Sequence, residues 1–237
     1  MEFWFLLINT YRIITDYAHI LKHKYNRTTP LHGILNEFME ASFFTRHPFI
    51  KDLMSLVIFV ICVIVGTILI NTYVFRSFNV VGPSMETTLY TGDRLIVNRV
   101  PITWAQIKGD TYVPHRGQVI VFKNPHYSLG IEDEYIVKRV IAYPGERVLL
   151  KDGQYTIFNA ESPAGFNPDD NNNGEPGSPT TGEVDIIVPE NELFVSGDHR
   201  TGNFSYDSRN GLGTVPFYDV VGPVNVRIFP FNEMRTF

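Results

Sequence analysis

The stretch Val80-Val81-Gly82-Pro83-Ser84-Met85-Glu86-Thr87-Thr88-Leu89 decides how the rest of the chain is interpreted. It stands between a long hydrophobic segment and a region of short runs and turns, so the architecture changes here. Ser84 follows a Gly-Pro turn, and a serine hydroxyl becomes a good nucleophile only when a positioned base takes its proton. We expect Lys138 to be that base and Ser205 to orient it.

The hydrophobic segment before this stretch runs from Leu53 to Phe75 and contains no charged residue. A membrane-spanning helix needs about 20 apolar residues, each adding ~1.5 Å, and this segment is long enough. It begins too far from the N-terminus for a signal peptide. No alanine lies between Leu53 and Trp104, so an Ala-x-Ala cleavage site is missing. The sequence therefore predicts a stable transmembrane helix over residues 53–75.

Residues 1–52 are expected to form a cytoplasmic or interfacial helical segment. Apolar residues follow helical spacing between residues 3 and 21, but Arg12 and Asp16 interrupt them. Each charge costs about 2.5–3.5 kcal/mol at the bilayer centre, so we expect a helix on the membrane surface, with a second span as the alternative. A cytoplasmic N-terminus follows when all basic residues of the segment are counted. These residues are Arg12, Lys22, Lys24, Arg27, Arg46 and Lys51.

From residue 76 onward, short runs of branched and aromatic residues alternate with turn-forming pairs such as Asn-Pro and Asp-Gly. Such runs are typical of β-strands. No long helical pattern interrupts them, so we expect an all-β soluble domain over residues 76–237, with coiled antiparallel sheets or a partly closed barrel. The predicted strands are 94–100, 118–122, 135–141, 147–150, 184–188, 192–196 and 220–229.

Residues 160–183 are rich in Asn, Asp, Gly and Pro, and we expect an exposed, mobile insertion loop there. The run Asp169-Asp-Asn-Asn-Asn-Gly174 matches the opening of a calcium-binding loop. The twelfth position of such a loop carries a bidentate acid, but Thr180 occupies it here. We therefore expect no metal site in the insertion.

The composition excludes several classes of protein. The net charge is −5 and the chain has no basic run, no Gly-rich phosphate loop and no zinc-type cysteine spacing, so nucleic-acid binding is disfavoured and no cofactor is expected. Cys62 is the single cysteine and lies inside the hydrophobic segment. The chain therefore has no intramolecular disulfide, and no thiol in the soluble part can act as a nucleophile.

Four blocks of sequence follow one another behind the predicted span. They are Ser84–Leu89, Gly92–Val97, Lys138–Glu146 and Gly197–Arg209. Each block alone is a weak signal, but in this order they resemble bacterial type I signal peptidases, the membrane-anchored serine–lysine proteases that remove signal peptides. The resemblance extends over about residues 80–230 and implies that the partners are precursor proteins bearing signal peptides.

The resemblance implies a role for each matching residue in the reaction. Ser84 stands at the position of the nucleophile, Lys138 at that of the general base, and Ser205 at that of the serine that hydrogen-bonds the lysine. Some family members also carry a hydroxyl residue two positions before the nucleophile, which donates to the oxyanion. That position is Gly82 here, so we expect the backbone N–H of Ser84 to serve instead.

The remaining matches concern the surroundings of the reacting groups. The resemblance implies that Asp207 and Arg209 form an ion pair that shapes the site, and that Asp198 is the acid of the last block. Met85 flanks the nucleophile. We expect Met85 and Val81, together with Val80, to face the substrate or dip into the lipid surface.

A serine–lysine pair requires an uncharged lysine. Free lysine has a pKa of ~10.4, and burial in an apolar setting lowers the pKa of lysine by as much as ~3–5 units. Strand alternation aims Lys138 to the same face as Ile136 and Val140, which favours such a setting. Arg139 points to the other face and does not repel the amine.

These features predict a membrane-bound endopeptidase with an extracytoplasmic catalytic domain, anchored once in the plasma membrane. The span ends nine residues before Ser84, which sets the site beside the outer membrane surface. Two alternatives remain open. One is a self-cleaving repressor-type serine–lysine protease, and the other is a membrane-tethered β adaptor without catalytic activity.

Overall fold

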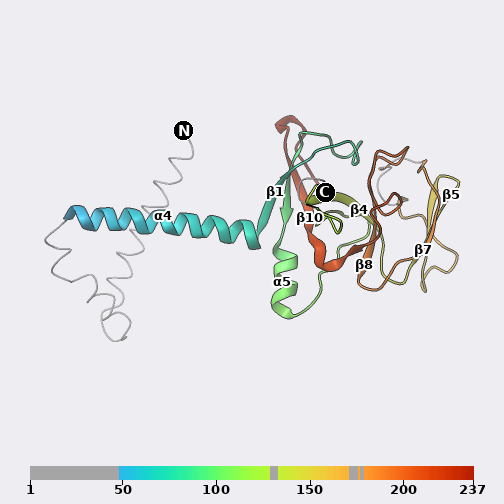
Figure 1. Ribbon diagram of the computed structural model, residues 1–237, viewed down its shortest axis with the longest axis horizontal. Coiled ribbons are helices and arrows are strands. Elements are labelled where there is room, and N and C mark those ends of the chain that lie inside the picture. The colour runs from blue at the N-terminus through green and yellow to red at the C-terminus, as the bar shows by residue number, and fades with distance from the viewer. Residues whose placement is uncertain (1–47, 129–132, 171–175, 177–178) are drawn as a thin grey trace. The chain divides into compact units, whose positions relative to one another are not determined.

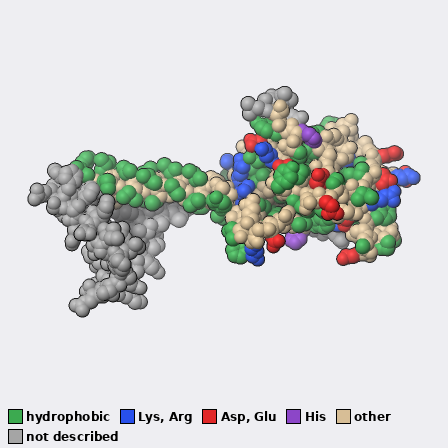
Figure 2. Space-filling model, turned by 60° about the horizontal axis from the view of Figure 1, so that its bottom comes forward, with side chains coloured by type: hydrophobic (Ala, Val, Ile, Leu, Met, Phe, Trp, Pro, Cys, Tyr) green, Lys and Arg blue, Asp and Glu red, His purple; other side chains and the backbone are tan. Residues whose placement is uncertain are grey.

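The structure is a computed structural model that describes residues 48–128, 133–170, 176 and 179–237. Helix α4 (Pro48–Tyr73) contains the hydrophobic segment. It starts five residues before the predicted span and ends two residues before the predicted end of that span. Its first residue is a proline, which is well tolerated at a helix start because the first helical N–H groups have no partner within the helix. Residues 52–73 have a mean hydropathy of 3.1 and are long and apolar enough to cross a membrane. Hydrophobic side chains cover the surface of α4 (Figure 2). The helix predicted within residues 3–21 lies outside the described residues.

The soluble part is built around a curled, antiparallel eight-stranded sheet (Figure 1), which confirms the predicted all-β class. The strands lie in the order β1-β2-β10-β3-β4-β8-β9, and β11 pairs with β10. Their bounds are β1 (Phe75–Asn79), β2 (Arg94–Asn98), β3 (Val119–Lys123), β4 (Tyr135–Ala142), β8 (Glu192–Ser196), β9 (Val215–Pro216), β10 (Val220–Phe229) and β11 (Arg235–Thr236).

The curl of this sheet comes from β10, which changes its neighbour along its length. Its first residues pair with β3 and the residues from Val224 onward pair with β2. Gly222 lies at the change, and a Cβ there would be 2.3 Å from the Asn98 carbonyl oxygen. Only glycine allows the two backbones to approach so closely.

A second, three-stranded sheet has the order β6-β5-β7. Its strands are β5 (Arg147–Lys151), β6 (Gln154–Phe158) and β7 (Val184–Ile187). Val148 and Leu150 alternate inward along β5, and they share a buried cluster with Ile141 of β4 and Phe194 of β8. The apolar face of the small sheet therefore packs against the large one.

Helix α5 (Val100–Lys108) was not predicted from the sequence. It spans nine residues, which is too short for a convincing helical pattern. Its proline at the N-terminus is well placed, because the first helical N–H groups have no partner within a helix. The preceding strand β2 consequently ends at Asn98 rather than Val100. Two short 3-10 turns, η1 (Phe217–Asp219) and η2 (Phe231–Glu233), complete the fold.

In the described part of the insertion over residues 160–183, most residues are exposed or half-buried, as expected, but a few are buried. Asp169 pairs with Arg200, whose side chain is 1% exposed. Pro176 and Thr180 are also buried. Buried charges require a partner, so the acidic run supplies a carboxylate that attaches the insertion to the domain.

Candidate active site

The loop that carries Ser84 is held on both sides by backbone hydrogen bonds. The Val80 N–H donates to Asp93 O at 2.9 Å, and the Gly92 N–H donates to Val80 O at 2.9 Å. Gly82 has φ of +89° and donates its N–H to Thr91 Oγ1 at 3.0 Å. Residues with a Cβ rarely adopt this backbone conformation, so the turn before Ser84 favours glycine and leaves no side-chain hydroxyl there.

Lys138 projects from β4 toward Ser84. Its Nζ lies 2.8 Å from Ser84 Oγ and 2.9 Å from the carbonyl oxygen of Val137. The residue is 3% exposed. Two residues that are 54 positions apart in the sequence are thus within hydrogen-bonding distance, which is the geometry a general base and its nucleophile require.

Burial lowers the pKa of Lys138 to about 8, although the nearby carboxylates of Asp207 and Asp198 oppose this change. A large fraction of the amine is therefore neutral at mildly alkaline pH. A neutral amine has one lone pair and two protons. With one N–H donated to the Val137 carbonyl, the lone pair is available to accept the Ser84 hydroxyl proton.

Ser205 is fully buried close to the site, but its hydrogen bond differs from the predicted one. Its hydroxyl donates to Asp207 Oδ2 at 2.7 Å. The hydrogen bonds of the Lys138 amine go to Ser84 and to the Val137 carbonyl, and none joins it to Ser205. The second partner of the amine is thus a backbone carbonyl, which residue type cannot reveal because every residue carries one.

The acids of the last block stabilise the walls of the site. Asp207 accepts hydrogen bonds from the Gly197 N–H at 2.9 Å and from Arg209 Nη2 at 2.9 Å. Asp198 accepts from Arg139 Nε at 2.8 Å and from Thr88 Oγ1 at 2.5 Å. Both carboxylates are buried and fully partnered, which suits a structural role. Arg139 points away from the amine, as the strand alternation predicts.

Gly197 occupies the tightest position in the site. A Cβ at this residue would lie 2.1 Å from Ser205 Oγ and 2.3 Å from the carbonyl oxygen of Ser84. The β8 end therefore approaches the nucleophile loop at a distance that leaves no room for a side chain.

His199 is a site residue that the sequence did not single out. Its backbone N–H donates to Ser84 O at 3.1 Å, and its ring Nδ1 lies 3.1 Å from Pro83 O. Because a carbonyl oxygen only accepts, Nδ1 carries the proton in this contact. The ring also stacks on Phe204, with centroids 4.7 Å apart. A single histidine without a neighbouring partner in the sequence gives no signal for such a contact.

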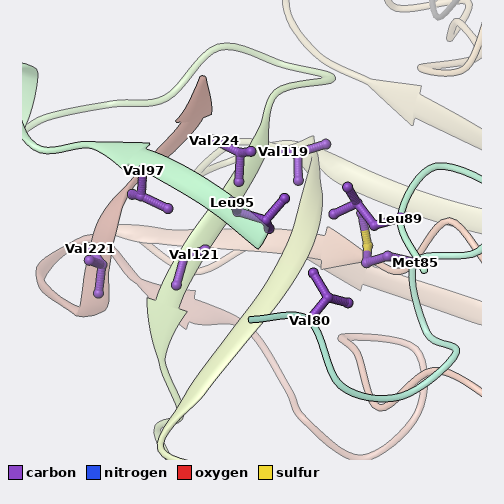
Figure 3. Close-up of a cluster of buried hydrophobic side chains, with 9 residues drawn as sticks. All are labelled: Val80, Met85, Leu89, Leu95, Val97, Val119, Val121, Val221 and Val224. Atoms are coloured by element: carbon purple, nitrogen blue, oxygen red, sulfur yellow. The ribbon is translucent and has the colours of Figure 1, made fainter. Parts of the chain in front are cut away.

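Met85 does not face substrate or lipid, contrary to the prediction. Met85 is 0% exposed and Val80 is 4% exposed. Both pack with Leu89 against the strands of the large sheet (Figure 3). Burying these side chains fixes the loop to the core, so their apolar character serves packing. Val81 is 76% exposed and keeps the outward position expected for it.

A groove with a volume of about 710 Å³ lies beside Ser84 and Lys138. One wall is formed by residues 78–84 and another by residues 133–138. β4 pairs with β3 along residues 135–139, but its pairing with β8 begins only at Arg139. The other edge of β4 is therefore unpaired beside the groove. Within the described residues, no group of three or more His, Cys, Asp or Glu side chains is arranged to hold a metal ion.

Comparisons with known proteins give consistent similarities. The family model described as "Signal peptidase, peptidase S26" matches residues 50–229. The chain is 33% identical over 182 residues to signal peptidase I of Bacillus licheniformis, covering 74% of this chain and 88% of that protein. It is 32% identical over 178 residues to signal peptidase I T of Bacillus subtilis, covering 74% of this chain and 85% of that protein. A crystal structure of a signal peptidase I from Enterococcus faecalis matches with 26% identity and a TM-score of 0.35, over 48% of this chain and 98% of that chain.

Proposed function

The chain belongs to the signal peptidase family, peptidase S26, and is a serine endopeptidase that cleaves signal peptides; from this premise we propose that Ser84 and Lys138 are its catalytic pair. The observation that carries the proposal is the 2.8 Å separation of Lys138 Nζ and Ser84 Oγ, with the amine buried. An adaptor without activity would not need an amine sheltered from water against a hydroxyl.

The reaction proceeds by acyl transfer. The neutral Lys138 amine takes the Ser84 proton while Oγ attacks the carbonyl carbon before the scissile bond. The resulting ammonium returns the proton to the leaving amine of the mature chain, which leaves an ester on Ser84. Water then attacks this ester with Lys138 again acting as base, and the signal peptide is released with a free carboxylate.

The oxyanion that forms during each attack needs a hydrogen-bond donor. In the described part of the chain, the backbone N–H of Ser84 donates to no other group, so it is available for this role. One oxyanion donor contributes ~10²–10³-fold to the rate. Because Gly82 brings no hydroxyl, the N–H of Ser84 carries more of this stabilisation than in a site with a side-chain donor.

The substrate binds as an extended segment along the open edge of β4. Addition of a strand satisfies backbone groups of both partners, while pockets select side chains. The groove beside residues 135–138 is also lined by Ser84 and Lys138, so a segment bound along this edge would pass the proposed catalytic pair. Small residues at the −1 and −3 positions are the preference that the family implies.

We propose that α4 anchors the chain once in the plasma membrane, with the N-terminus in the cytoplasm. The apolar helix precedes the catalytic domain, and the basic residues before it favour a cytoplasmic N-terminus. The catalytic domain then lies outside the plasma membrane, where the precursors emerge.

Substitution of each reacting group tests the catalytic pair. Ser84→Ala should abolish precursor cleavage in detergent, and Lys138→Ala should reduce it by at least about 10²–10⁴-fold. Lys123→Ala, an exposed lysine on the neighbouring strand β3, is the matched control and should cleave normally. Unchanged cleavage by either active-site variant would refute the proposal.

A further inference from the structure

The end of α4 is bonded to the residues that begin α5. Arg99 Nε donates to Thr72 O at 2.6 Å, and Thr103 Oγ1 donates to Tyr73 O at 2.9 Å. The last carbonyls of a helix lack partners within it, and a cation is favourable at this negative end of the helix dipole. α5 is therefore held directly beside the end of the apolar helix.

The outer face of α5 is apolar although it is exposed. Val100 is 49% exposed, Trp104 58% and Ile107 72%. Val100 and Trp104 are four positions apart, and Trp104 and Ile107 are three apart, so the three side chains lie in one row along the helix. Ile102, by contrast, is buried in the domain. α5 thus uses one side to join the domain and presents a hydrophobic stripe on the other.

We propose that this stripe of α5 docks into the headgroup layer of the phospholipid bilayer in which α4 is anchored. The argument rests on the proposed anchoring of α4. Thr103 contacts the end of the span and Trp104 is the next residue, so the stripe begins at the depth where the span ends. Tryptophan is enriched at that depth. Lys108 Nζ lies 5.2 Å from the Trp104 ring centroid, and a lysine at such a boundary keeps its charge in water while its stem covers apolar surface.

The docking surface differs from the one that the sequence suggested. Val80 and Met85 are part of the core, which leaves Val81 as the only exposed member of that group. A helix is a better interfacial element than a loop, because its own hydrogen bonds satisfy its backbone when the apolar face enters lipid. The bilayer surface then restrains the catalytic domain at the point where the chain leaves the membrane.

Depth-dependent fluorescence quenching tests the proposal in the full chain. The sequence has two tryptophans, so Trp4→Phe leaves Trp104 as the only one. In phosphatidylcholine vesicles, nitroxide near the headgroup should quench Trp104 more strongly than nitroxide at the acyl chain end. A matched control carries Trp4→Phe, Trp104→Phe and Ile187→Trp. Ile187 is 68% exposed on β7, and a tryptophan there should remain unquenched.

A tryptophan inside α4 separates the two possible failures. Phe59→Trp, with both native tryptophans replaced, should be quenched most by nitroxide deep in the bilayer. If Phe59→Trp is quenched but Trp104 is quenched no more than the β7 control, the docking of α5 is refuted. If Phe59→Trp is not quenched either, the proposed anchoring fails and the docking proposal falls with it. Loss of cleavage in Ser84→Ala leaves these signals unchanged, so the catalytic pair is tested separately.

Cleavage rates give a second measurement. Trp104→Ala combined with Ile107→Ser should reduce cleavage of a vesicle-embedded precursor by about tenfold, because apolar burial at the interface is lost. A short soluble peptide should be cleaved at the normal rate, which also shows that the variant is folded. Equal losses on both substrates would assign α5 to folding and overturn the proposal.

Discussion

At the scale of single residues, the proposed role of Lys138 as general base combines two opposing requirements. Its buried position keeps the amine neutral enough to accept a proton, and it also makes the charged form costly. Groups tuned in this way for catalysis commonly reduce stability. Burial of Lys138 should therefore favour activity and lower the free energy of unfolding, and these two effects can be measured separately.

Activity should increase with pH up to about the pKa of Lys138. Only the neutral amine accepts the Ser84 proton, so kcat/KM should rise about tenfold per pH unit below pH 8 and level off above it. The profile is measured on a precursor that has no titrating group in this range. A rate that is independent of pH, or that falls through this range, would contradict the role of a neutral lysine.

Stability should show the cost of burying Lys138. The pKa is lowered from its ordinary 10.5 to about 8, so between these values the unfolded chain binds more protons than the folded one. The free energy of unfolding therefore rises with pH in this window, and the full cost is present below it. Lys138→Met should raise the free energy of unfolding at neutral pH by on the order of 1–3 kcal/mol.

Unfolding of the full chain in detergent measures this effect. The gain of Lys138→Met should shrink toward zero as the pH approaches 10.5. Lys123→Met, at an exposed position on β3, should change little at any pH. A destabilised Lys138→Met at neutral pH would show that the amine contributes more through its two hydrogen bonds than its burial costs.

Gly197 should tolerate no side chain. In Gly197→Ala the new Cβ collides with Ser205 Oγ and the Ser84 carbonyl oxygen, so the nucleophile loop must move away from Lys138. We expect a loss of precursor cleavage of at least about 100-fold, and a destabilisation of ~1–3 kcal/mol from overpacking. Gly66→Ala is the control, because no atom lies within 4 Å of a Cβ there. Normal cleavage by Gly197→Ala would contradict the geometry of the site.

At the scale of elements, the described part of the insertion over residues 160–183 contains a buried ion pair between Asp169 and Arg200. Removing Asp169 would leave the guanidinium of Arg200 buried without this carboxylate, and breaking a buried pair costs ~3–5 kcal/mol. Asp169→Ala should therefore destabilise the domain and open the insertion to limited proteolysis. Asp170→Ala, at the exposed neighbour, should leave both unchanged. Equal resistance of the two variants to proteolysis would show that the pair does not attach the insertion.

The sequence predicted those elements whose pattern is regular. The runs at β2, β3, β4, β5, β7, β8 and β10 were identified, because branched and aromatic residues mark strands. β1 directly follows the hydrophobic segment, and its first residue, Phe75, was included in the predicted span. β6 was not predicted, and α5 spans only nine residues, which is too short for a recognisable helical period.

Candidate residues could be chosen from the sequence where the proposed chemistry depends on residue type. Ser84 and Lys138 were chosen from motif order, and the structure places their side chains 2.8 Å apart. Val137 contacts the amine through its backbone and His199 contacts the loop across the fold, so neither had a signal in the sequence. The prediction for Met85 was wrong for a related reason. The residue type alone does not show whether an apolar side chain beside an active site packs into the core or faces the substrate.

At the scale of the whole molecule, a single residue, Val74, separates the end of α4 at Tyr73 from the start of β1 at Phe75. The hydrogen bonds from Arg99 and Thr103 strengthen this junction. A short linker behaves differently from a long flexible one, because it limits the positions that the attached site samples.

Loosening the junction should impair cleavage in membranes specifically. Insertion of a flexible Gly-Ser segment between Tyr73 and Val74 separates α4 from α5, and we expect cleavage of a vesicle-embedded precursor to fall by about tenfold. Cleavage of a soluble peptide should be unchanged. Normal processing of the embedded precursor would show that the catalytic domain works without a fixed connection to its anchor.

The open edge of β4 has a consequence for solubility. Unpaired strand edges in soluble proteins recruit other extended chains and lead to aggregation, and most proteins cover or charge them. Here residues 78–84 and the aromatic side chains of Phe204 and Tyr206 line the groove beside this edge. We expect these walls to admit a single extended segment and to hinder the approach of a whole sheet. The protein can thus retain backbone groups ready for pairing without polymerising through them.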